Sequence, residues 1–109
     1  MSKQSTEEMI LATNPKAPRL TPADIEAVIV GEVFHRHEGT TLTTCILTLR
    51  NGFQVTGESA CASPENFSEA VGNKVARENA FAKVWTLEGY LLKERLFQAA
   101  STPLPGMAS

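Results

Sequence analysis

Hydrophobic and β-branched residues gather in two short runs in the middle of the chain, one ending at Arg50 and the next beginning at Phe53. Asn51-Gly52 between such runs predicts a β-hairpin, because both positions of a two-residue type I′ turn need positive φ. A two-residue loop pairs Arg50 with Phe53 and Thr48 with Val55. This register leaves apolar side chains on both faces of the sheet, so we expect cover on both faces and hence an oligomer.

A short helix is expected to begin at Thr21. The Thr21 side chain can cap the first turn, Pro22 fits the first helical position, and Asp24 suits the positive end of the helix dipole. Apolar residues follow at helical spacing. The helix should end near Gly31, before a strand over Val33–His37.

A second helix start, at Ser63-Pro64, opens a helical pattern that continues to Ala100. Its apolar residues fall on or near one stripe, formed by Val71, Val75, Ala82, Trp85, Leu92 and Leu96. One unbroken helix over Pro64–Ala99 would be about 54 Å long, whereas a compact domain of this size is about 30 Å across. We therefore expect two helices, or one helix bent near Thr86–Gly89, unless the helix protrudes and packs on another subunit.

These elements predict an α+β fold: a short N-terminal helix, a small antiparallel β-sheet with an Asn-Gly hairpin, and two C-terminal helices or one bent helix. Residues 21–100 form the single domain. Proline-containing segments without periodicity precede and follow it, so residues 1–20 and 101–109 are expected to be flexible tails.

Composition narrows the function classes. The 109 residues carry a net charge of −2, so the excess of base that a duplex nucleic-acid binder needs is missing. No apolar run is long enough to span a membrane, and the first residues lack the apolar core of a signal peptide. We therefore expect a cytoplasmic protein that binds neither duplex nucleic acid nor a membrane.

Cysteine and histidine spacing predicts no structural metal site and no cofactor. Cys45 and Cys61 form no Cys-x-x-Cys pair, and in a reducing cytosol they are most simply small buried hydrophobes. His35 and His37 have strand spacing and would point to one side of a strand. Such a pair could supply half of a metal site, or it could be a solvated strand end.

A polar, partly basic strip is expected on the C-terminal helical segment. Asn73 and Arg77 follow at helical spacing, with Asn79 and Lys83 beside them, and Arg95 lies farther along. This strip is either a solvated face or an anion or nucleotide pocket. Arginine offers a planar fork for phosphate, and a ring such as Phe67 or Tyr90 could stack on a base.

Three segments together carry a family resemblance: Leu49–Cys61, Pro64–Phe67 and Trp85–Leu92. They resemble a family of small tailed-phage proteins that is similar to the Thoeris anti-defence sponges, and the resemblance covers roughly Thr21–Leu96. It implies a small α+β protein that assembles as a dimer or hexamer in the host cytoplasm. Such a protein binds a cyclic ADP-ribose isomer or related cyclic nucleotide and sequesters it without cleavage, so no enzyme activity is expected.

The resemblance also implies a ligand site. In the sponges an aromatic ring and an arginine from the helical region flank the adenine. The nearest matching positions in this chain are Phe67 and Arg95, with Arg77 and Asn79 as further polar contacts.

Two other functions stay open from the residues alone. A hairpin with apolar residues on both faces could add to the sheet edge of a host protein and inhibit it. A small hydrolase could use His35 or His37.

Overall fold

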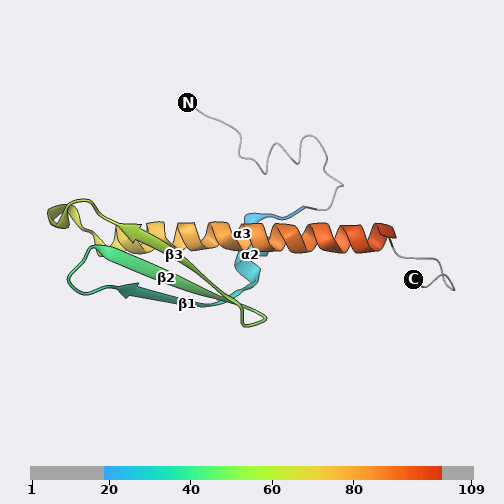
Figure 1. The fold of residues 1–109 in the computed structure, drawn as a ribbon, viewed down its shortest axis with the longest axis horizontal. Coiled ribbons are helices and arrows are strands. Elements are labelled where there is room, and N and C mark those ends of the chain that lie inside the picture. The colour runs from blue at the N-terminus through green and yellow to red at the C-terminus, as the bar shows by residue number, and fades with distance from the viewer. Residues whose placement is uncertain (1–18, 102–109) are drawn as a thin grey trace, which may run out of the picture.

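The computed structural model describes residues 19–101. The two expected tails, residues 1–20 and 101–109, fall almost entirely outside the described residues. Within them, the chain forms one antiparallel three-stranded sheet and one long helix that lies across a face of the sheet (Figure 1). The predicted α+β class is therefore confirmed. The elements are α2 (Pro22–Ala27), β1 (Ile29–Arg36), β2 (Leu42–Leu49), β3 (Gln54–Ala60), the 3₁₀ turn η1 (Pro64–Asn66) and α3 (Glu69–Ser101).

Helix α2 begins where the sequence predicted and ends earlier. Thr21 and Asp24 form a capping box, in which each side chain accepts a hydrogen bond from the other residue's backbone N–H. The helix ends at Ala27 rather than near Gly31, because Ile29 already pairs with Leu49 on β2. Strand β1 consequently starts four residues before the predicted strand.

The β2–β3 hairpin has a three-residue loop, so the predicted register is wrong by one residue. Gly52 has a φ of +92°, Asn51 has no positive φ, and the Leu49 N–H donates to the Phe53 carbonyl across the loop. This geometry fits a type I turn closed by a left-handed glycine rather than a two-residue turn. Val55 thus lies opposite Leu47, and the apolar residues gather on one face.

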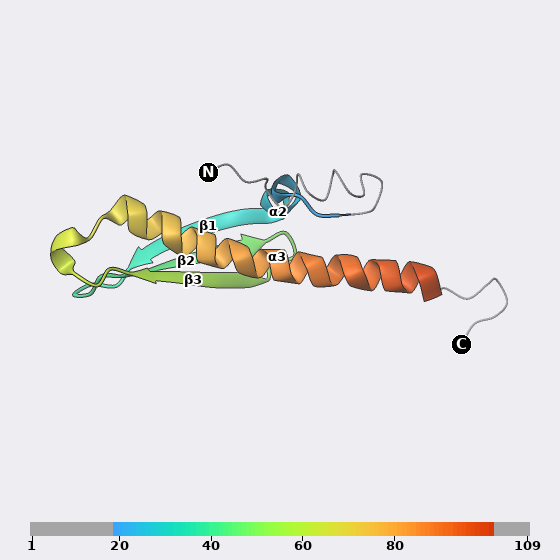
Figure 2. The ribbon, with the colours of Figure 1, turned by 90° about the horizontal axis from the view of Figure 1, so that it is seen from above.

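Helix α3 is a single element of 33 residues, about 50 Å long. It runs past the end of the sheet, whose eight-residue strands are about 27 Å long, and its second half projects beyond the hairpin (Figures 1 and 2). The alternative of a protruding helix is the one observed, and Gly89 sits inside the helix without ending it. The chain before it is not α-helical, since Phe67 is extended and separates η1 from α3.

The helix face that packs on the sheet is lined by small residues, and of the predicted stripe only Trp85 packs against the core of the described residues. Ala76, Ala80 and Val84 are fully buried, whereas Val71 and Leu96 are exposed. Small residues are needed on this helix face because the backbones of α3 and β3 lie in contact where they cross. A Cβ placed on Gly57 would lie only 2.2 Å from the Ala80 backbone nitrogen. Larger side chains would hold the helix too far from the sheet.

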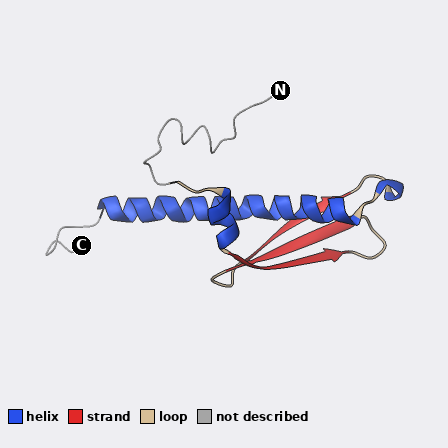
Figure 3. Ribbon diagram, turned by 180° about the vertical axis from the view of Figure 1, so that it is seen from behind, coloured by secondary structure: helices blue, strands red, loops and turns tan. Residues whose placement is uncertain are grey.

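The face of the sheet against α3, the inner face, forms the core. Buried residues from β2, β3, α3 and α2 meet there: Ile25, Cys45, Leu47, Leu49, Val55, Ala76, Ala80 and Val84. Helix α2 closes one end by crossing near the middle of α3 (Figure 3). None of the helices in residues 19–101 is long and apolar enough to cross a membrane.

The opposite, outer face of the sheet carries threonines together with Val33 and Ile46. No described segment covers it, and Val33 is 57% exposed. Both β1 and β3 are edge strands in the described part of the chain.

Candidate functional site

The four residues predicted to bind a ligand do not meet in one site within the chain. Phe67 and Asn79 line a common hollow, and Arg77 belongs to an ion-pair cluster elsewhere. Arg95 is exposed on the projecting half of α3, about 24 Å along the helix from Asn79. Two cavities of the described residues could hold part of a ligand, the Phe67 hollow and a second one at the hairpin end, and neither Arg77 nor Arg95 lines them.

The first place is the Phe67 hollow, about 490 Å³ in volume, between the end of β3 and the start of α3. The Arg36 guanidinium lies 4.1 Å above the centre of the Phe67 ring and so occupies one ring face. The Asn79 side-chain amide donates to the Glu58 carbonyl at 2.7 Å. Both predicted residues thus already have structural partners.

Arg77 joins three elements. Its guanidinium donates two hydrogen bonds to the Glu26 carboxylate of α2 and one, at 2.6 Å, to Glu32 of β1. These bonds raise the pKa of Arg77 further above its usual range. Three of its five N–H groups donate to these two carboxylates, which connects α3 with α2 and β1, so the structure gives Arg77 a structural role.

The two cysteines differ in burial. Cys45 is fully buried on the inner face, and burial, with a smaller contribution from the Glu32 carboxylate, raises the pKa of its thiol. Cys61 is half-buried, and its thiol donates to the Ser63 carbonyl. For Cys45 the predicted role as a small buried hydrophobe is confirmed.

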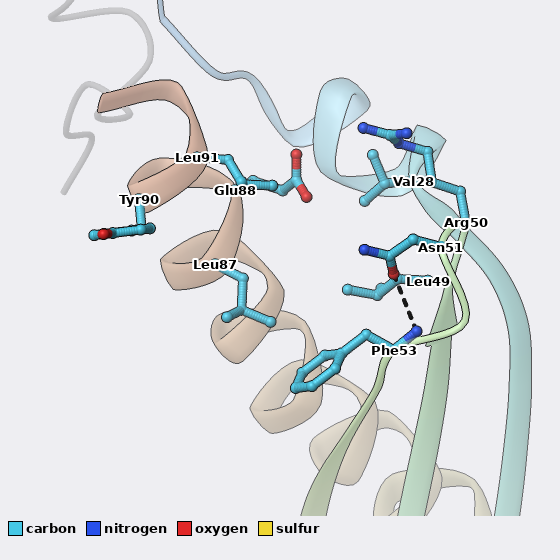
Figure 4. Close-up of a pocket in the computed structure, with 9 residues that line it drawn as sticks. All are labelled: Val28, Leu49, Arg50, Asn51, Phe53, Leu87, Glu88, Tyr90 and Leu91. Carbon is cyan, nitrogen blue, oxygen red and sulfur yellow. Dashed lines mark hydrogen bonds between the residues drawn. The ribbon is translucent and has the colours of Figure 1, made fainter. Parts of the chain in front are cut away.

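The second place is the hairpin-end cavity, about 230 Å³ in volume, where the β2–β3 loop faces the middle of α3 (Figure 4). Its wall is mostly apolar, and the hairpin and α3 both contribute polar side chains to it. It is lined by Val28, Leu49, Arg50, Asn51, Phe53, Leu87, Glu88, Tyr90 and Leu91.

Glu88 is the unusual residue of this cavity. It occupies the next position, four residues on, of the buried series Ala76, Ala80 and Val84, and it is only 8% exposed. Within residues 19–101 its carboxylate has neither a hydrogen-bond partner nor an ion-pair partner. Figure 4 shows the carboxylate pointing into the space that the Arg50 guanidinium borders from the other side.

The hairpin loop positions the remaining polar groups. The Asn51 carbonyl oxygen accepts a hydrogen bond from the Phe53 N–H at 3.0 Å, which fixes the side chain and leaves its amide N–H groups to face the cavity (Figure 4). Arg50 is exposed and forms no ion pair with any described residue. The cavity therefore offers a carboxylate acceptor, an amide donor, a cation and an aromatic ring.

Such a combination suits a ligand that is flat and apolar in one part and anionic in another. A ring such as Phe53 can pack on a base, arginine can bind phosphate, and the carboxylate and amide can bind the base edge. Arg50, Asn51 and Glu88 were missed in the sequence because polar residues in a turn and in a helix look ordinary there. The signal that could have found them is their place in two of the segments that carry the family resemblance, which converge on this cavity.

The chain matches the "Phage protein (N4 Gp49/phage Sf6 gene 66) family" over residues 20–96. It belongs to this family. The match spans every strand and all but the last residues of α3, so both sides of the hairpin-end cavity lie within the family's shared region. The family description names phage proteins and states no activity. No curated protein matches the chain significantly, and neither does any solved structure.

Proposed function

We propose that this phage-family protein binds a cyclic ADP-ribose-type signal nucleotide, or a related cyclic oligonucleotide, and sequesters it in the host cytoplasm without cleaving it. The observation that carries the proposal is the hairpin-end cavity. There the two segments that resemble the Thoeris anti-defence sponges face each other across Arg50 and Glu88. The net charge of −2 gives little long-range attraction for a phosphate, so affinity must come from such locally oriented groups.

The cavity is small for a whole cyclic dinucleotide. Its volume of about 230 Å³ lies below the roughly 300–1,000 Å³ of typical ligand pockets, so one chain encloses a base and leaves the rest of the ligand uncovered. Next to its mouth, the projecting half of α3 exposes Tyr90, Leu91, Leu96 and Phe97. A dimer or hexamer built on this half would cover both the apolar side chains and the ligand.

The chemistry of the lining supports binding rather than turnover. Hydrolysis by side chains needs an activated nucleophile or a paired acid and base. The cavity has one carboxylate and no serine, cysteine or histidine in its lining. His35 and His37 lie toward the other end of β1, where the His37 Nε2 forms a hydrogen bond with the Thr44 hydroxyl.

The test is ligand depletion followed by release. The protein is incubated with cyclic ADP-ribose isomers and with cyclic di- and trinucleotides, the free fraction is filtered off, and the protein is then heat-denatured. We expect one compound to disappear from the filtrate and to return chemically intact on heating, as measured by mass spectrometry. Recovery of a cleaved product contradicts sequestration, and so does failure to deplete any compound.

Two arginine variants locate the site. Arg50→Ala should weaken binding roughly ten- to a hundredfold, the usual loss for a charged hydrogen bond. Arg95→Ala serves as the matched variant, because it removes the same side chain from the exposed helix end. Loss of binding in Arg95→Ala with full binding in Arg50→Ala would place the ligand at the helix end instead.

The uncovered outer face of the sheet supports a second candidate, a protein that binds and inhibits a host protein. The edges of β1 and β3 are available for strand addition, and Val33 is exposed beside the β1 edge. This function predicts that no nucleotide is depleted. It also predicts a stoichiometric complex with one host enzyme in native mass spectrometry, lost on placing a proline in β1 or β3.

A further inference from the structure

We infer that His35 and His37 form a chelate site for one divalent late transition-metal ion, such as Ni²⁺ or Cu²⁺, on the outer face of the sheet. The pair lies where β1 runs into the loop before β2, at the opposite end of the sheet from the hairpin-end cavity. The inference is therefore independent of the proposed nucleotide binding. Neither histidine belongs to the core of the described residues.

The first step is the strand geometry that puts both rings on one face. His35 pairs with Thr44 across the β1–β2 ladder, and the His37 N–H still donates to the Leu42 carbonyl at 3.0 Å, so the chain stays extended through His37. Side chains two residues apart on an extended strand point to the same side. Here that side is the outer face, where His35 is exposed, so an ion in solvent can reach the pair.

The second step is the spacing of the two rings. Their centres are 4.6 Å apart and their planes are nearly perpendicular, at 83°. If both rings bind one ion through a nitrogen about 2 Å from it, their centres lie roughly 4.5–5 Å apart. The two rings therefore already lie at the separation that a chelate requires.

The third step is the hydrogen bond that orients His37. Its Nε2 lies 2.7 Å from the Thr44 hydroxyl oxygen. When Nε2 carries the proton and donates to this oxygen, the lone pair of Nδ1 is left for a metal ion. Histidines that bind metals usually donate their second N–H in this way, which fixes both the tautomer and the ring. Thr44 is therefore a positioning residue of the proposed site.

The fourth step is the class of ion. Within residues 19–101, no group of three or more histidine, cysteine or acidic side chains is placed to hold a metal. The pair therefore supplies two nitrogen ligands, and water completes the coordination. This differs from the closed four-ligand shell of structural zinc and from the oxygen cage that Ca²⁺ needs. Imidazole suits Ni²⁺ and Cu²⁺, which bind a given site more tightly than Mn²⁺ or Fe²⁺.

The experiment is a calorimetric titration of Ni²⁺ into the full-length protein without a histidine tag. Ni²⁺ is the probe because Cu²⁺ would oxidise the half-buried Cys61 thiol. We expect one Ni²⁺ per chain with micromolar affinity, and no binding of Mg²⁺. His35→Ala and His37→Ala should each abolish binding at the same Ni²⁺ concentration, since one imidazole alone forms no chelate. Cys61→Ser is the matched control: it removes a different soft ligand and should bind Ni²⁺ like the natural chain.

Two variants of Thr44 test its positioning role. Thr44→Val removes the hydroxyl and keeps the shape of the side chain, so it should weaken Ni²⁺ binding roughly tenfold. Thr44→Ser keeps the hydroxyl and should bind like the natural chain. If Thr44→Val binds as tightly as Thr44→Ser, the assigned tautomer is wrong and the role of Thr44 is overturned.

NMR spectra of the natural protein keep the test independent of how well a variant folds. Because Ni²⁺ is paramagnetic, a small amount should broaden the ring signals of His35 and His37 together and leave those of Phe53 sharp. Broadening at Cys61 instead, binding that survives in either histidine variant, one ion per two chains, or no binding below millimolar Ni²⁺ each overturns the inference. Nucleotide depletion by His35→Ala should equal that of the natural chain, so the proposed function is tested separately.

Discussion

At the residue scale, Gly57 decides how closely β3 approaches α3. A Cβ at this position would lie 2.2 Å from the Ala80 nitrogen and 2.3 Å from the Ala76 oxygen, which are backbone atoms that cannot rotate away. Gly57→Ala should therefore destabilise the protein by about 1–3 kcal/mol or more, measured by urea denaturation.

Gly89→Ala is the matched control for this prediction. A Cβ on Gly89 meets nothing within 4 Å, and the residue lies inside α3. Alanine is the better helix former by up to about 1 kcal/mol, so this variant should be as stable as the natural chain or more stable. Equal destabilisation by both substitutions would show that the close approach at Gly57 is not what limits the packing.

The close contact between Gly57 and Ala80 also explains why the buried face of α3 could not be predicted from the sequence. Large apolar residues such as Val71 and Leu96 are the usual markers of a buried helix face, and here they are exposed. The close crossing of α3 over β3 requires alanine on the buried helix face instead. The residue pattern of α3 alone does not indicate Gly57, the β3 residue that makes this crossing possible. Glu88 escaped notice for a related reason, since a glutamate in a helix is usually solvated.

At the element scale, Arg77 ties α3 to α2 and β1 through Glu26 and Glu32. Arg77→Ala should lower stability by about 1–2 kcal/mol, because two partly exposed ion pairs each contribute up to about 1 kcal/mol. Nucleotide binding per folded molecule should stay unchanged. Thermal denaturation and calorimetric titration of one preparation measure both quantities.

Lys74→Ala provides the comparison, since it breaks the exposed pair with Glu78 within α3 alone. Its effect should stay below about 0.5 kcal/mol. If Arg77→Ala were as mild as Lys74→Ala while abolishing binding, Arg77 would be a ligand residue after all.

The local preferences of the residues predicted the helices and strands well, but they did not predict the register between β2 and β3. The Thr21 cap, the hairpin and the long helical segment follow from short-range preferences of the residues involved. The register of the hairpin does not follow from such preferences, because Asn51-Gly52 fits a two-residue loop and the end of a three-residue loop equally well. Packing chooses between them: only the longer loop brings Val55 onto the face that α3 covers.

At the scale of the whole molecule, half of α3 has no partner within the described chain. Phe97 is 54% exposed and Tyr90 68% exposed, on a helix that extends past the sheet. Light scattering at micromolar concentration should return a multiple of 11.8 kDa. Leu96→Glu combined with Phe97→Glu should reduce the mass to that of one chain, because charges on both sides of an interface cannot be buried.

The control for assembly is Ala82→Glu, an exposed charge on the half of α3 that lies along the sheet. It should leave the mass unchanged, and circular dichroism should show the same helix content in both variants. A natural chain that scatters as 11.8 kDa contradicts the proposed assembly.

The cavity shows why a site is harder to predict than a fold. Arg50 and Glu88 are 38 positions apart, and only the crossing of α3 over the hairpin brings them to one space. Phe67 and Asn79 line one hollow because the first turns of α3 follow Phe67 directly in the chain. Arg95 could not join them, since an unbroken helix carries it away.

The order of the elements along the chain also governs how the protein is made. During translation the three strands leave the ribosome before α3, so Cys45 and Leu47 are uncovered and two strand edges are open. The residues that cover them, through Val84, follow only later. Until then the nascent chain presents an apolar sheet to its surroundings, which favours chaperone capture and aggregation. Once α3 emerges, the neighbour-to-neighbour order of the strands favours rapid closure of the core.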